Sequence, residues 1–197
     1  KGKVTLTPSA VTDVELPLCE DGAHIWRPFA PVADIDVQLE KSGWSWSGHG
    51  YFDANFGTRA LEQDFDYWTW GRFPTEAGAC CFYDATRCDG SHLAAAITFD
   101  KNGHAHTVQS PPRASFKPAF WGVHRETRAD LGFAPHEVMP MLDAPFYNRA
   151  MVETKINGEV VTGVHESLDL SRFRKPWLMP MLAMRVPRRK NWPKQRL

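Results

Sequence analysis

The sequence predicts an all-β fold, an antiparallel barrel or sandwich with a short C-terminal helix. Apolar and polar residues alternate with period two, the alternating segments are short, and turn residues separate them. Such alternation turns one face of each strand toward a core. Many short strands at regular spacing are typical of antiparallel barrels and sandwiches. The length of 197 residues suits a single domain spanning 1–197.

Turn residues define the strands. The clearest hairpin is 149–168, where Asn157-Gly158 joins two alternating runs and favours the positive φ angles of a tight turn. Asn102-Gly103 forms a similar turn after the alternating run 92–100. Further strands are predicted at 33–40, 62–70, 79–86, 104–109 and 119–127.

Helix is predicted only near the C-terminus, over 175–186. Pro176 suits a first helical turn, and Pro180 interrupts the helix that follows. The tail 185–197 is basic and contains Trp192. It is either a solvated terminus or a patch that attaches to anionic lipid headgroups.

Charge and cysteine content exclude several classes of protein. Lys+Arg and Asp+Glu both number 23, so the chain has no net charge to attract nucleic acid. The four cysteines, Cys19, Cys80, Cys81 and Cys88, form no CxxC pair and no zinc-ligand spacing. They are interpreted as reduced thiols of a cytoplasmic protein. No signal sequence and no window of about 20 apolar residues is present, so neither secretion nor membrane insertion is predicted.

Tryptophan is abundant, with eight residues in the chain. Because residues two apart share a strand face, Trp44 and Trp46 point the same way, as do Trp68 and Trp70. Together with Trp121, these indoles are the predicted lining of a deep apolar pocket. The alternative is ordinary core packing.

An acid lies within an aromatic run at "GYFDANFG", where Tyr51 and Asp53 share a face. A carboxylate buried beside aromatic rings is costly unless it is protonated or paired, and apolar surroundings raise its pKa. Asp53 is therefore a candidate proton donor near neutral pH. The alternative is that it caps a turn before "ANFG".

Histidines provide a second candidate group. His24 and Trp26 are two apart and would share a strand face, although a hydrogen-bonded structural histidine is the alternative reading of His24. His104 and His106 could also share a face, but no third ligand has a useful spacing, so no metal is predicted. The absence of a Gly-x-Ser-x-Gly elbow, a phosphate loop and a dinucleotide fingerprint argues against those chemistries.

Several segments together resemble one family. "HIWRPFAPVADIDVQLE", "WSGHGYFDANFG", "FDYWTWGRF", "VHESLDLSRF" and "MRVPRR" closely resemble the carotenoid 1,2-hydratases, or hydroxyneurosporene synthases, from about residue 20 to residue 190. The resemblance implies a lipocalin-like fold with two barrel-like halves. This chain would be the C-terminal portion, with its own N-terminal domain as a partner.

The resemblance also implies a reaction and its residues. Family members add water to the terminal C1=C2 bond of acyclic carotenoids such as neurosporene and lycopene, without a cofactor. The family's H-x-W motif corresponds to His24 and Trp26, and its Y-x-D motif to Tyr51 and Asp53. Asp53 would protonate the alkene, and the aromatic rings would stabilise the tertiary cation. Either His24 or Tyr51 would take the proton from the attacking water.

A polyene substrate would need an elongated apolar tunnel and access to the membrane that dissolves it. Peripheral attachment through the tail or through 175–186 is therefore expected. Two rival functions remain: a lipocalin-like carrier of an apolar isoprenoid, and a lipocalin-like cyclase or pericyclase. Asp53 distinguishes them, because a carrier gains nothing from a buried acid and a cyclase depends mainly on pocket shape.

Overall fold

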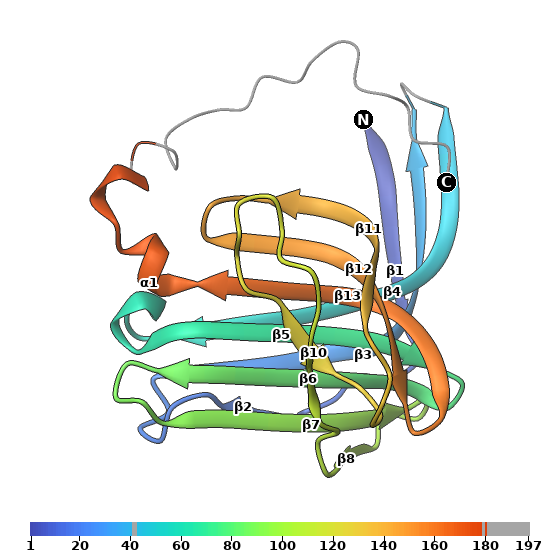
Figure 1. Ribbon diagram of the computed structural model, residues 1–197. Helices are drawn as coiled ribbons and strands as arrows, with labels where there is room; N and C mark the ends of the chain where they lie inside the picture. The colour runs from blue at the N-terminus through green and yellow to red at the C-terminus, as the bar shows by residue number, and fades with distance from the viewer. Residues whose placement is uncertain (41–42, 179, 181–197) are drawn as a thin grey trace.

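Two antiparallel β-sheets pack against each other in the computed structural model, which describes residues 1–40, 43–178 and 180 (Figure 1). The larger sheet has seven strands in the order β11-β12-β13-β5-β6-β7-β8. In the smaller sheet, β1, β2 and β4 all pair with β3. The strands are β1 Gly2–Pro8, β2 Leu16–Pro17, β3 His24–Leu39, β4 Trp44–Gly57, β5 Phe65–Thr75, β6 Gly78–Arg87, β7 His92–Asp100, β8 Ala105–Thr107, β9 Arg113–Ser115, β10 Glu126–Arg128, β11 His136–Asp143, β12 Tyr147–Ile156 and β13 Glu159–Asp169.

The all-β antiparallel prediction is confirmed, in its sandwich form. Within the described residues β4 pairs with β3 alone, and β11 and β8 end the larger sheet. A barrel requires every strand edge to find a partner. These edges do not, so the described strands form no closed barrel.

Prolines bend β3 in its middle. Pro28 and Pro31 have no N–H to donate to the strand ladder, and the pairing with β4 shifts register on both sides of Ala30. Arg72 donates two hydrogen bonds to the carbonyl of Pro31, at 3.1 and 2.8 Å, which holds the bent segment against β5. Beyond the bend, β1 and the far halves of β3 and β4 extend past the larger sheet (Figure 1). We call this extension the arm: β1 with residues 33–39 and 44–50.

The core lies between the two sheets and is rich in rings. It joins Trp26 of the smaller sheet to Phe65, Trp68 and Tyr83 of the larger one. The interior strand β6 is buried from its first residue to Ala85, because both of its faces are covered. A strand covered on both faces reads as a continuous apolar run rather than an alternating one.

The segment around β9 and β10 covers the second face of the larger sheet. Arg128 of β10 donates to Asp84 of β6 through Nε at 3.0 Å, and its carbonyl accepts from Thr154 of β12 at 2.8 Å. This polar contact replaces water that buried Asp84 would otherwise require.

The hairpin prediction is confirmed. β12 and β13 pair from Tyr147↔Leu168 to Ile156↔Glu159, and Asn157 and Gly158 adopt φ angles of 52° and 87°. The strand predicted at 119–127 is wrong over most of its length, because only the end of it belongs to β10. Gly122 has a φ angle of 70° and ends a turn in which its backbone N–H donates to the carbonyl of Ala119.

The C-terminal helix is short. β13 leads into α1, Leu170–Phe173, whose first turn is capped by the Asp169 side chain accepting from the Arg172 amide at 2.9 Å. Of the helix predicted over 175–186, the described residues contain the 3-10 turn Pro176–Leu178, and residues 179 and 181–186 lie outside the described residues. Residues 181–197, including the basic tail 185–197, lie outside the described residues. No helix in the described part of the chain is long and apolar enough to cross a membrane.

The burial of His165 makes the stability of the folded protein depend on pH. It is 1% exposed on β13, hydrogen-bonds through Nε2 to the Glu126 carbonyl at 2.8 Å, and meets the Phe116 ring edge-on. Burial lowers the pKa of His165 from 6.5 to about 4. The unfolded chain therefore binds a proton at pH values where the folded chain does not.

We expect stability to fall as the pH drops from about 6.5 toward 4, because protonation of His165 favours the unfolded state there. Between pH 7.5 and 5.0 this group should cost about 2 kcal/mol. Urea unfolding at the two pH values measures the loss. It should shrink in His165→Gln and persist in His49→Gln, which alters an exposed histidine. An unchanged loss in His165→Gln would contradict the assignment.

Candidate active site

A cavity of about 250 Å³ opens between the smaller sheet and the larger one. It is lined by Tyr51, Phe52, Asp53, Asn55, Trp68, Trp70, Tyr83, Arg149 and Glu166. Phe52 and Asn55 are exposed, so the cavity opens to the surface beside β4. Four of the residues singled out in the sequence meet here: Tyr51, Asp53, Trp68 and Trp70.

One row of residues that are paired across neighbouring strands of the larger sheet forms the floor of the cavity. Strand register places Arg149, Glu166, Trp70 and Tyr83 next to one another across β12, β13, β5 and β6. Directly paired residues share a sheet face, so one row combines an ion pair with two aromatic rings.

Asp53 is held by an indole. Trp26 is 1% exposed, and its Nε1–H donates to Asp53 Oδ2 at 2.7 Å. Pairing along β3 and β4 sets Trp26 opposite Asn55, which makes Asp53 its diagonal neighbour, within reach of a long aromatic side chain. Since an indole N–H can only donate, Oδ2 is fixed as an acceptor. A proton carried by this carboxyl therefore belongs on Oδ1.

Tyr51 is a neutral phenol in this wall. Its ring packs against Trp70 at 5.2 Å, and the Arg72 guanidinium lies 6.0 Å from its centre. Burial raises the pKa of Tyr51 far above its usual value, with smaller contributions from Cys81 and Asp53. Tyr51 therefore keeps its proton at neutral pH.

The predicted tryptophans divide into two groups. Trp68 and Trp70 are buried and line the cavity, and Trp68 and Trp26 both pack on Tyr83 at 5.7 Å. Trp44 and Trp46 share a strand but lie in the arm, 40% and 45% exposed, and do not line this cavity. Trp121 lies on the turn at Gly122 and is 46% exposed, also away from it.

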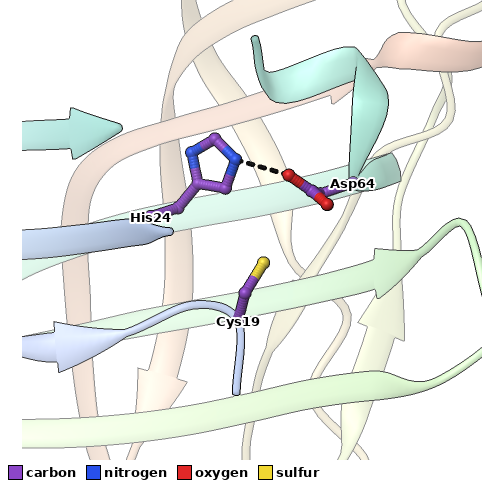
Figure 2. Close-up of side chains that lie close together, drawn as sticks. All are labelled: Cys19, His24 and Asp64. Carbon is purple, nitrogen blue, oxygen red and sulfur yellow. Dashed lines mark hydrogen bonds and ion pairs between the residues drawn. The ribbon is translucent and has the colours of Figure 1, made fainter. Parts of the chain in front are cut away.

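His24 is bonded to a different carboxylate from the one that Trp26 binds. Figure 2 shows its Nε2 directed at Asp64, whose Oδ2 lies 2.8 Å away. Arg59 donates to both oxygens of that carboxylate, at 2.6 and 2.8 Å, and lowers the pKa of Asp64, with His24 adding to the effect. His24 is 2% exposed and meets Phe65 edge-on. It does not line the cavity that holds Asp53.

Cys19 completes this second cluster (Figure 2). One ligand atom each from Cys19, His24 and Asp64 lie within 4.8 Å of one another, a donor set that a zinc-like ion accepts. A cation would, however, have to displace the Arg59 guanidinium from both Asp64 oxygens. We therefore interpret the cluster as a network that fixes the His24 ring. All four cysteines are free thiols.

Sequence reasoning missed Glu166 and Arg149. Their side chains form an ion pair at 3.3 Å inside the cavity. A signal was present, because Glu166 lies on the same strand face as Val164 and Leu168 in the predicted hairpin. An acid between apolar residues on one strand face is the pattern that identified Asp53.

Comparison with known proteins adds relatives of stated activity. A family model described as carotenoid hydratase CrtC matches residues 1–195. The acyclic carotenoid 1,2-hydratase of Cereibacter sphaeroides is 60% identical over 192 residues, which cover 98% of this chain and 68% of the relative. That of Rhodobacter capsulatus is 55% identical, with the same coverage. That of Thiocapsa roseopersicina is 38% identical, and the chain spans only 47% of its length.

A solved structure supports the fold alone. A protein described as an AttH from Nitrosomonas europaea superposes with a TM-score of 0.53 at 16% identity, over 85% of this chain and 61% of that one. Its architecture agrees with the lipocalin-like prediction. The family model matches nearly the whole chain, and the similar relatives are named carotenoid 1,2-hydratases, which are hydro-lyases. This chain therefore belongs to the CrtC carotenoid hydratase family.

Proposed function

We propose that this protein hydrates the terminal C1=C2 bond of an acyclic carotenoid without a cofactor. The observation that carries the proposal is Asp53, a carboxyl anchored by Trp26 at the wall of a cavity rich in aromatic rings. Protonation of C2 by Asp53 leaves a tertiary cation at C1, and water then adds to C1. An acid, water and a proton acceptor suffice for this reaction.

The aromatic wall suits the cation that forms between these two steps. The rings of Tyr51, Trp68, Trp70 and Tyr83 present π faces that attract positive charge but are poor nucleophiles. Each such contact contributes about 0.5–2 kcal/mol. The wall therefore stabilises the cation without trapping it before water arrives.

Cavity size supports a substrate that enters by one end. About 250 Å³ is less than the roughly 300–1,000 Å³ of pockets that enclose a whole drug-sized ligand. A long polyene would place only its terminal unit beside Asp53. The remainder would leave past Phe52, which is 53% exposed and stacks on Phe29 at 5.5 Å.

Replacement of the acid tests the reaction. Asp53→Asn removes the proton donor and should lower the hydration rate about 100- to 10,000-fold. The assay is conversion of lycopene or neurosporene in detergent, followed by mass for the gain of one water. Asp36→Asn, which alters an exposed acid of the same sheet, should retain activity. Binding without turnover by the parent would favour a carrier. Conversion to a product without added water that survives Asp53→Asn would favour a cyclase.

Replacement of the indole tests how the acid is held. Trp26→Phe keeps an aromatic ring but deletes the N–H that bonds Asp53 Oδ2. A hydrogen bond to a charged group is worth about 1.5–3 kcal/mol, so kcat should fall roughly 10- to 100-fold. Polyene affinity, measured by quenching of tryptophan fluorescence, should change little. A loss of affinity with kcat unchanged would mean that Trp26 binds substrate instead.

We further propose that the protein attaches peripherally to membranes, where its substrate dissolves. Exposed Trp177 and the basic residues of 185–197 support this proposal. Changing Arg188, Arg189 and Lys190 to Gln should reduce flotation with anionic vesicles and leave flotation with neutral vesicles unaltered. Equal flotation of the variant and parent on anionic vesicles would contradict a role for the tail.

A further inference from the structure

The cavity contains a second carboxyl group besides Asp53. Glu166 of β13 is 17% exposed at its side chain and pairs in register with Trp70. It therefore lies on the floor of the cavity, whereas Asp53 belongs to the strand β4 that lies over it. The two carboxyls come from different sheets and line the same 250 Å³ space.

The neighbours of Glu166 act in opposite directions on its pKa. Arg149 Nε lies 3.3 Å from Glu166 Oε1, and the Tyr147 hydroxyl hydrogen-bonds to the same carboxylate. Burial raises the pKa of Glu166 above its usual value, against the opposing effects of Arg149 and Tyr147. Burial also raises the pKa of Tyr147, which therefore remains a donor. Negative charge on Asp53 raises the pKa of Glu166 further.

The effect of the Asp53 charge on the pKa of Glu166 favours hydration. When Asp53 gives its proton to the alkene it becomes negative, and a negative Asp53 makes Glu166 a stronger proton acceptor. Glu166 thus becomes more basic at the stage when water attacks and must lose a proton.

Other groups suit this step less well. His24 lies outside the cavity, bonded to Asp64. The phenols of Tyr51 and Tyr83 have pKa values raised mainly by burial and stay protonated. Among the described residues that line the cavity, Glu166 is the group left to accept a proton while Asp53 serves as the acid.

We propose that Glu166 is the general base that deprotonates the attacking water, opposite Asp53; this rests on the proposed hydratase function. The Asp53 proton and the alkene π pair form the C2–H bond, leaving C1 cationic. A lone pair of water forms the C1–O bond, and one water proton passes to the Glu166 carboxylate. Return of that proton to Asp53 through solvent restores both groups. The net change is alkene plus water to tertiary alcohol.

The test compares Glu166→Gln, Glu166→Ala and Asp53→Asn in the intact protein, with Glu153→Gln as the matched control. Glu153 lies on β12 of the same sheet, outside the cavity. Lycopene hydration gives kcat, and tryptophan quenching gives the Kd for the polyene independently of turnover. Circular dichroism and urea midpoints report folding.

Glu166→Gln should lower kcat about 100-fold or more while Kd stays within about twofold of the parent. Added formate should restore part of the rate in Glu166→Ala, because a small carboxylate can occupy the space of the lost one. A purely structural partner of Arg149 would show no such rescue of kcat.

Three results would overturn the proposal. The first is a kcat of Glu166→Gln near that of the parent together with an inactive Asp53→Asn. This result would support the hydratase function but show that Glu166 is not its base. Absence of hydration by the parent would remove the hydratase function and this inference with it. If Glu166→Gln does not fold, Glu166→Asp takes its place: it keeps the charge but withdraws the carboxylate by one methylene. A kcat within twofold of the parent in Glu166→Asp would then contradict the proposal.

Discussion

The break in the β3–β4 ladder at Pro28 is the constraint on which the site depends. Arg27 pairs with Ala54 and Ala30 with Phe52, so two residues of β3 face the single residue Asp53. This is a β-bulge, a device that bends a strand and redirects a side chain. Proline suits it because the missing N–H need not find a partner. Before the bulge, β3 packs on the larger sheet; after it, the same strand continues into the exposed arm (Figure 1).

A hydration would require both stabilisation of a cation and transfer of protons within this small cavity, and different residues of the cavity suit each requirement. In the proposed reaction, the rings that line most of the wall would stabilise the positive charge, and the carboxyls of Asp53 and Glu166 would transfer the protons. Asp53 is tied to an indole donor, whereas Glu166 is tied to a guanidinium. Neutral and cationic partners place two carboxyls in different electrostatic surroundings within the same cavity. Such a division is how proteins assign acid and base roles to chemically identical groups.

The H-x-W motif illustrates how one strand face can serve two purposes. His24 and Trp26 do share a face of β3, as the alternation predicts. Two residues along a strand nevertheless span roughly 6.6 Å, enough to reach separate surroundings. Trp26 bonds Asp53 in the cavity, and His24 bonds Asp64 beside Arg59. The His24 network fastens the start of β3 to the turn before β5, and so supports the position of Trp26 indirectly.

The sequence by itself determined the two alternating strands of the 149–168 hairpin, its turn at Asn157-Gly158, and the shared face of Tyr51 and Asp53. Each depends on local rules, namely turn chemistry and the period of two. Only the tertiary structure decided that Glu166 faces the cavity of Asp53 and that Trp46 lies in an exposed arm. Period two says which residues of a strand point together. It does not say which face meets which partner, because that depends on inter-strand register and on where a bulge bends the strand.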